Sequence, residues 1–123
     1  MFKILIVEDD KELSLLFQKV LEKSGYQVKS ASDGAQALEV LDREYIDLII
    51  SDIMMPVMDG LETAEKIRKS GREDAGTVII IAMSANAFYD DIERSIKAGM
   101  NTHIAKPIDA DELVNIIARQ AGR

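Results

Sequence analysis

The chain has 123 residues, and its 22 acidic and 15 basic side chains give a net charge of −7 with the single histidine neutral. Residues 1–123 suit one globular domain, and the absence of cysteine excludes disulfides, thiol nucleophiles and cysteine-ligated metals. The acidic balance argues against direct binding to nucleic acid or to an anionic membrane, and the longest apolar run, 78–83, is too short to span a bilayer, so we expect a soluble, cytoplasmic protein.

In the first half of the chain, strand patterns alternate with helix patterns. Residues 3–7 form a short run rich in β-branched side chains, which is typical of a buried strand, and residues 26–31 and 47–51 predict two more strands. Between the first two strands, apolar residues recur on one helical face, and Gly25 ends that helix. This face comprises Leu13, Leu16, Phe17, Val20 and Leu21. Asp33 can cap a second helix before the third strand.

The second half of the chain continues this alternation. Residues 60–70 and 87–98 predict helices, 77–83 a fully apolar strand and 102–105 a short strand, and Asp109 opens a last helix in the manner of a capping box. The residues expected to face inward on the second, third and last helices are Ala37, Leu38, Leu41, Leu61, Ala64, Ile67, Leu113, Ile116 and Ile117. Five strands alternating with five helices indicate an α/β fold with a doubly wound, five-stranded parallel sheet.

Polar residues stand at the carboxyl ends of four of the predicted strands. After strands one, three, four and five come Glu8-Asp9-Asp10, Asp52, Ser84 and Lys106-Pro107. Right-handed crossovers place the carboxyl ends of all parallel strands at one edge of the sheet, where ligands of open α/β sheets bind. We therefore expect these side chains to converge on one site.

The residue types at this edge predict phosphoryl chemistry. Three carboxylates in one crevice repel each other and favour a divalent cation, and oxygen ligands without histidine or cysteine favour Mg²⁺, with Mn²⁺ as an alternative. The ammonium of Lys106 and the hydroxyl of Ser84 can hold anionic phosphoryl oxygens. Without cysteine or a neighbouring histidine base, the expected nucleophile is a carboxylate, which would yield an aspartyl phosphate.

Taken singly, each of these residues also has a simpler explanation. Asp10 is better explained as the cap of the first helix, and Glu8 and Asp9 suit a cap and a cation site equally well. Asp52 alone would be a solvated loop acid, and the serine and the lysine alone would be a structural residue and a surface charge. The combination on four strands favours the site.

Four segments together resemble the receiver domain of two-component response regulators. They are residues 4–10, 52–60, 83–86 and 106–107, which read ILIVEDD, DIMMPVMDG, MSAN and KP. The resemblance covers the whole chain. It implies a flavodoxin-like sheet with the strand order 2-1-3-4-5, as in chemotaxis regulators.

The resemblance also implies a role for each site residue. Asp52 would be the phosphorylated aspartate and would contact Mg²⁺ together with Asp9, while Glu8 would act through a metal-bound water. The backbone carbonyl of Met54 would be a further metal ligand. Lys106 would pair with a phosphoryl oxygen as Asp52 attacks phosphorus in line.

The same resemblance implies a switch and two positions that tune hydrolysis. Ser84 would bind a phosphoryl oxygen and couple to His103, a position where the family more often has tyrosine or phenylalanine; a partly exposed strand residue without a switch role is the equal alternative. Met54 and Asn86 would tune dephosphorylation, and since methionine cannot orient water by a hydrogen bond, we expect a phosphoryl lifetime of minutes or more. Lys106 would precede a cis-proline at Pro107.

The implied function is a phosphorelay receiver. It would take a phosphoryl group from a phosphohistidine on a histidine kinase or histidine phosphotransfer domain, or from a small acyl phosphate. It would catalyse only its own phosphorylation and slow dephosphorylation, and would signal to an effector through residues 87–98, 102–105 and 109–119. A monomer or a phosphorylation-linked homodimer is expected, and residues 84–88 and 98–103 look more like receivers of hybrid histidine kinases than stand-alone regulators.

Three rival functions share this architecture. An FMN-binding module would need a hydroxyl- and glycine-rich phosphate loop where three acids stand. A phosphohydrolase with an aspartyl nucleophile would place a second acid at Met54. An interaction domain that has lost phosphorylation would not need the full set of site residues.

Overall fold

The computed structural model describes residues 2–53, 58–84, 89–106 and 108–122. Strands and helices alternate along the chain. In order they are β1 (Lys3–Val7), α1 (Lys11–Lys23), β2 (Gln27–Ala31), α2 (Gly34–Arg43), β3 (Leu48–Asp52), α3 (Gly60–Arg68), β4 (Ile79–Ser84), α4 (Tyr89–Lys97), β5 (Thr102–Ala105) and α5 (Ala110–Gln120).

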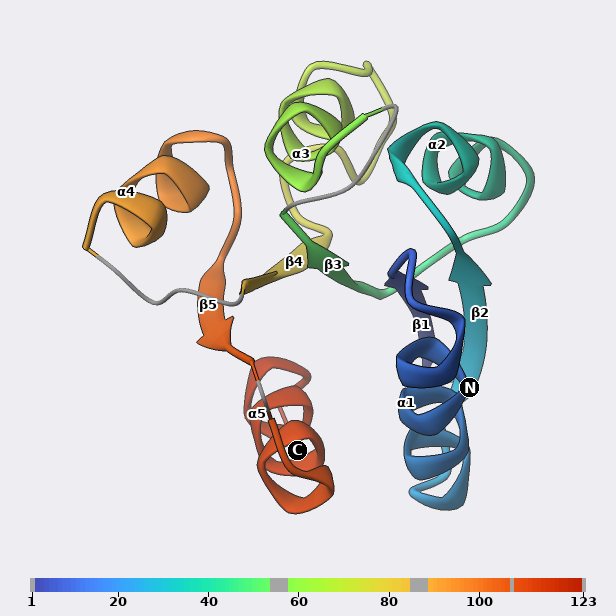
Figure 1. Ribbon diagram of the computed structural model, residues 1–123. Helices are drawn as coiled ribbons and strands as arrows, with labels where there is room; N and C mark the ends of the chain where they lie inside the picture. The colour runs from blue at the N-terminus through green and yellow to red at the C-terminus, as the bar shows by residue number, and fades with distance from the viewer. Residues whose placement is uncertain (1, 54–57, 85–88, 107, 123) are drawn as a thin grey trace.

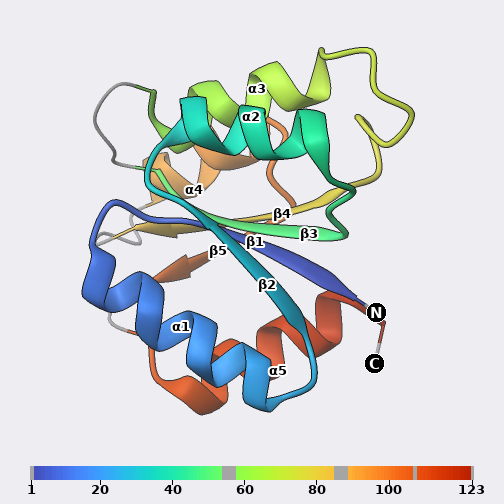
Figure 2. The ribbon, with the colours of Figure 1, turned by 90° about the vertical axis from the view of Figure 1, so that its right-hand side faces the viewer.

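The five strands form one parallel sheet in the order β2-β1-β3-β4-β5. Helices α1 and α5 cover one face of the sheet, and α2, α3 and α4 cover the other (Figures 1 and 2). This confirms the predicted doubly wound sheet and its strand order. In the described ranges, no helix is both long enough and apolar enough to cross a membrane.

Each central strand supplies two cores, because successive side chains of a strand point to opposite faces. In β1, Ile4 and Ile6 pack with α1 and α5, whereas Leu5 and Val7 pack with α2 and α3. Strand β3 does the same, and all five of its residues are buried. Its apolar run, residues 48–50, therefore reflects burial on both faces.

Four helices begin with an aspartate cap. In each, the aspartate side chain accepts a hydrogen bond from the backbone N–H three residues later, which satisfies a donor that the first turn leaves free. The caps are Asp10, Asp33, Asp59 and Asp109. The predicted capping by Asp10, Asp33 and Asp109 is confirmed, and Asp59 is an addition.

The predicted inward face of α1 is wrong at Leu16. Its side chain is 54% exposed, and the buried face of α1 comprises Ser14, Phe17 and Leu21. These three lie at i, i+3 and i+7, so Leu16, about 100° around the helix from Phe17, points toward solvent. The prediction used apolar residues alone, and it therefore placed the centre of the buried face of α1 one residue away from its observed position.

Some predicted element boundaries also shift. Strand β4 begins at Ile79 rather than at residue 77, because the N–H groups of Thr77 and Val78 donate to the carbonyl of Asp74 in a turn. Helix α3 ends at Arg68. Asp52 and Ser84 are the last residues of their strands rather than the first residues after them.

Gly60 marks the close approach of α3 to the end of β3. Its N–H donates to the carbonyl of Ile53 at 3.2 Å. A Cβ atom at Gly60 would lie 2.4 Å from the carbonyl oxygen of Asp52 and 2.9 Å from the Cα of Ile53. Both are backbone atoms, which cannot move aside as a side chain can.

Gly60→Ala is therefore expected to lower the free energy of unfolding by about 1–3 kcal/mol, the usual effect of overpacking. Gly76→Ala is the matched control, since a Cβ there would meet nothing within 4 Å, and it is expected to be neutral or stabilising by about 0.4–1 kcal/mol. Urea denaturation of both variants measures the difference. Equal midpoints for the two would contradict this account of Gly60.

Candidate functional site

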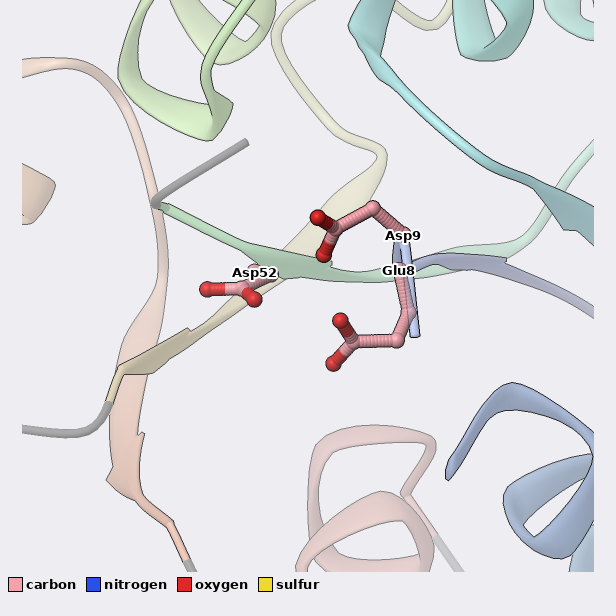
Figure 3. Close-up of side chains that lie close together, drawn as sticks. All are labelled: Glu8, Asp9 and Asp52. Atoms are coloured by element: carbon pink, nitrogen blue, oxygen red, sulfur yellow. The ribbon is translucent and has the colours of Figure 1, made fainter. Parts of the chain in front are cut away.

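Three carboxylates meet at the carboxyl edge of the sheet. Glu8 and Asp9 follow β1 and Asp52 ends β3, and one oxygen of each lies within 4.8 Å of the others. Figure 3 shows the carboxyl groups of Glu8 and Asp9 turned toward that of Asp52. Glu8 and Asp52 are only 2% and 6% exposed, whereas Asp9 is open to solvent. The acids that the sequence placed at one edge do lie together.

Lys106, which directly follows the edge strand β5, joins this group. Its Nζ donates to Glu8 Oε1 at 2.6 Å and to Asp52 Oδ2 at 2.9 Å. Its backbone N–H donates to the carbonyl of Ser84 at 2.7 Å, which fixes the residue directly after β5. Burial disfavours the ammonium, but the bonds to the two carboxylates more than offset this and raise the pKa of Lys106.

Of the three acids, Glu8 has a pKa that its surroundings raise. Burial raises its pKa, and the charge of Asp52 acts in the same direction. The hydrogen bonds from Lys106 and from the N–H of Asp10, which donates to Glu8 Oε2 at 3.2 Å, only partly oppose this rise. One ammonium thus serves two buried carboxylates beside a third, exposed one.

This donor set fits a hard divalent cation. The oxygens of Glu8, Asp9 and Asp52 lie close enough to share an ion, and all are carboxylate oxygens, which Mg²⁺ and Mn²⁺ prefer. The charge balance agrees, because Lys106 alone does not neutralise three acids. Residues at this edge can therefore hold a metal and an anion side by side.

Ser84 and His103 form a pair next to the carboxylates. Ser84 Oγ and His103 Nε2 are hydrogen-bonded at 2.9 Å, with Ser84 buried at the end of β4 and His103 half-buried in β5. The tautomer of His103 decides which atom donates. The two residues expected to communicate are in direct contact.

Three of the predicted site residues lie outside the described part of the chain. These are Met54, Asn86 and Pro107. The carbonyl ligand, the two hydrolysis-tuning positions and the cis peptide bond therefore stay predictions.

Sequence reasoning missed two hydrogen bonds, one to the carboxylate of Glu8 and one to the backbone of Asp52. The backbone N–H of Asp10 donates to Glu8, and the buried Ser51 hydroxyl donates to the carbonyl of Asp52 at 3.0 Å. A serine near the end of an otherwise apolar strand was the available signal for Ser51. No side-chain pattern could indicate the backbone contact.

Comparison with known proteins agrees with this geometry. The model of the family described as response regulator receiver domain matches residues 4–118. The chain is 36% identical over 120 residues to sensor histidine kinase RcsC of Salmonella typhi, covering 98% of this chain but only 12% of that relative's length. It is 35% identical over 117 residues to sporulation initiation phosphotransferase F of Bacillus subtilis, covering 95% of this chain and 91% of the relative.

Solved structures share the fold. Chemotaxis protein CheY4 of Vibrio cholerae has a TM-score of 0.91 at 27% identity, with 97% of this chain and 98% of that chain covered. The receiver domain of sensor histidine kinase PA1611 from Pseudomonas aeruginosa has a TM-score of 0.88 at 37% identity, covering 99% and 98%. That neighbour has a magnesium ion coordinated in its active-site cleft.

The raised pKa of Glu8 predicts how stability depends on pH. The folded state holds this proton more tightly than the unfolded chain, whose glutamate titrates near 4.5. The contribution of Glu8 to the free energy of unfolding therefore falls as the pH rises from below 4.5 through the raised value. Glu8→Gln removes this loss and still offers Lys106 an acceptor. Without divalent cations it should melt at a higher temperature than the wild type at neutral pH.

The difference should shrink as the pH falls below 4.5. Glu39→Gln, at an exposed position of α2, is the control and should melt like the wild type. Thermal melts followed by circular dichroism at several pH values measure this. A Glu8→Gln variant that is less stable than the wild type at neutral pH would contradict the electrostatic assignment.

Proposed function

The chain belongs to the response regulator receiver domain family, a family of signalling domains of two-component systems, and we propose that it accepts a phosphoryl group on Asp52 from a phosphohistidine. The donor would be a histidine kinase or a histidine phosphotransfer domain, or a small acyl phosphate. The observation that supports this most is the Lys106 ammonium bridging Glu8 and Asp52 beside Asp9.

The proposed transfer uses Asp52 as the nucleophile. A carboxylate oxygen of Asp52 forms a bond to phosphorus while the bond to the donor nitrogen breaks in line, and the electron pair leaves with the imidazole. Lys106 would keep one hydrogen bond to Glu8 and turn the other from Asp52 to a phosphoryl oxygen. Its buried charge then acts where negative charge accumulates.

Glu8, Asp9 and Asp52 would hold Mg²⁺, with Mn²⁺ as the alternative and the Met54 carbonyl as a further ligand. When bound, the ion supplies positive charge to the phosphoryl oxygens and to the carboxylates around them. The magnesium in the related receiver of sensor histidine kinase PA1611 supports this choice of metal.

The proposed signal starts at Ser84. Its hydroxyl is hydrogen-bonded to His103. In the tautomer whose Nε2 accepts from this hydroxyl, a phosphoryl oxygen on Asp52 that takes the hydroxyl proton as its hydrogen bond displaces the imidazole. Release of His103 would shift the populations of two conformations of the surface formed by α4, β5 and α5. An effector protein or an attached domain would bind to this surface. The domain acts as a switch and catalyses only its own phosphorylation and slow dephosphorylation.

We propose that this receiver, residues 1–123, works in the cytoplasm as part of a hybrid histidine kinase. The similarity to sensor histidine kinase RcsC supports this parentage. A stand-alone regulator is the alternative, and the match to nearly the whole of sporulation initiation phosphotransferase F supports it. Either form would act as a monomer or as a phosphorylation-linked homodimer, without direct contact to nucleic acid or membrane.

Phosphorylation by acetyl phosphate and Mg²⁺ tests the acceptor. Intact mass spectrometry should show one adduct of about 80 Da, which Asp52→Asn should abolish and chelation of the metal should strongly reduce. Asp42→Asn, an exposed aspartate of α2, is the control and should be labelled like the wild type. An adduct that persists in Asp52→Asn would refute the assignment.

The Ser84–His103 pair offers a direct test of the signal, because the chain contains one histidine and its imidazole NMR signal needs no further assignment. Phosphorylation should shift this signal as the bond to Ser84 breaks. In Ser84→Ala the signal should start at a different position and move far less. Ser70→Ala, whose hydroxyl donates to the carbonyl of Ile67, is the control and should behave like the wild type. An imidazole signal that ignores phosphorylation would exclude His103 as the switch.

A further inference from the structure

Strand β5 contains His103 and directly precedes Lys106, but it is weakly anchored by its own side chains. It has four residues, lies at the edge of the sheet and pairs only with β4. Of its side chains only Ile104 is buried. Register is poorly specified where few side chains fix a strand to one face, and a slip of one residue turns every side chain to the opposite face.

The register of β5 determines what reaches the site. In the observed pairing, His103 lies opposite Ala82 and Ala105 lies opposite Ser84. The next residue, Lys106, is thereby placed within hydrogen-bonding distance of Glu8 and Asp52. A different register would remove both the lysine and the imidazole from their partners.

Asn101, directly before β5, fixes this register at the other end of the strand. Its N–H donates to the carbonyl of Ile80 at 2.7 Å, and its side-chain Oδ1 accepts from the N–H of Ile80 at 2.8 Å. One residue thus engages both backbone groups of a single β4 residue. This pairing aligns the start of β5 before the strand begins.

Arg68 holds Asn101 in place from the end of α3. Its Nη2 donates to Asn101 Oδ1 at 2.9 Å, and its Nε donates to the carbonyl of Gly99 at 2.8 Å. Its Nη1 donates to the carbonyls of Ala75 and Val78 at 3.1 and 2.7 Å. The planar guanidinium therefore ties α3, the loop before β4 and the turn before β5 together, which a point-like ammonium cannot do.

Gly99 shows how closely this contact is fitted. Its φ of 102° lies in the left-handed region, and a Cβ there would lie 2.7 Å from the Cγ of Arg68. The turn thus leaves room for the arginine side chain to pass and exposes its carbonyl to the guanidinium.

We propose that Arg68 and Asn101 are positioning residues that clamp the register of β5 and so deliver His103 and Lys106 to the Asp52 site. The clamp lies five residues from Lys106, about 16 Å along a strand, so it acts through β5 and not by contact. Its consequence for phosphoryl transfer rests on the proposed function, whereas its consequence for His103 does not.

Three variants test the clamp. Arg68→Lys keeps the charge but cannot span the same acceptors, and Asn101→Ala removes the shared oxygen. Asn101→Asp keeps an oxygen that accepts from both Arg68 and the N–H of Ile80, and should therefore behave like the wild type. Arg72→Gln is the matched control, because Arg72 lies in the loop that follows α3 but bonds to the carbonyl of Leu41 and to Asp74, away from β5.

Two readouts are needed. Without phosphate, Arg68→Lys and Asn101→Ala should shift the imidazole signal of the single histidine and the amide signals of residues 102–106, while Arg72→Gln should not. With acetyl phosphate and Mg²⁺, the same two variants should be labelled up to about a hundredfold more slowly, as expected when a catalytic group is misplaced by about 1 Å. Asn101→Asp should be labelled at the wild-type rate.

The outcomes separate the two proposals. The clamp proposal is overturned if Arg68→Lys and Asn101→Ala show the same NMR signals and labelling rates as Arg72→Gln at equal stability. In that case the two residues would only stabilise the fold in general and would not position β5. Shifted signals with an unchanged labelling rate would likewise refute the positioning of Lys106. If the wild type is not labelled at all, the proposed function fails, and the imidazole and amide signals alone decide on the clamp.

Discussion

The site depends on one ammonium shared by two buried carboxylates. A parallel sheet brings the ends of its strands to one edge, and in this sequence Glu8 directly follows β1 and Asp52 ends β3. Two such acids with little solvent access destabilise each other unless positive charge stands between them. Lys106 supplies it, and the raised pKa values of Glu8 and Lys106 both reflect this arrangement. A cation or a phosphoryl group that enters the site must rearrange these contacts.

The rest of the fold supports the same edge. The central strands are apolar until their last residues, so the hydrophobic cores hold the strands while their ends remain polar. Helices that follow parallel strands run back along the sheet, which places their amino termini near the strand ends. Those termini carry the partial positive charge of the helix dipole, and each of the four aspartate caps satisfies one of their free N–H groups. The edge thus combines fixed dipoles, carboxylates and one lysine.

The sequence alone could predict what depends on local pattern. Alternating strands and helices led to the sheet, and the residue after each strand led to the group of acids with Lys106, because topology sends strand ends to one place. It could not predict contacts between distant segments. Nothing in the local sequence around Arg68 indicates its partners, because they lie up to 33 residues away. The error at Leu16 was a local one. Its apolar side chain was assigned to the buried face, although its angular position on the helix directs it to solvent.

The two ends of β5 have different physical characters, and this difference suits a switch. At its start, Asn101 and Arg68 make several hydrogen bonds with backbone and amide groups. A change of charge at Asp52 gives these neutral groups no new partner, so the bonds should stay as they are. Further along, His103 within the strand and Lys106 directly after it bond to the hydroxyl of Ser84 and to carboxylates, all of which can take other partners. An edge strand loose at both ends could slip, and one fixed at both ends could not respond. A strand fixed at its start and bonded exchangeably at its end can move its imidazole and lysine while keeping its register, which the proposed mechanism requires.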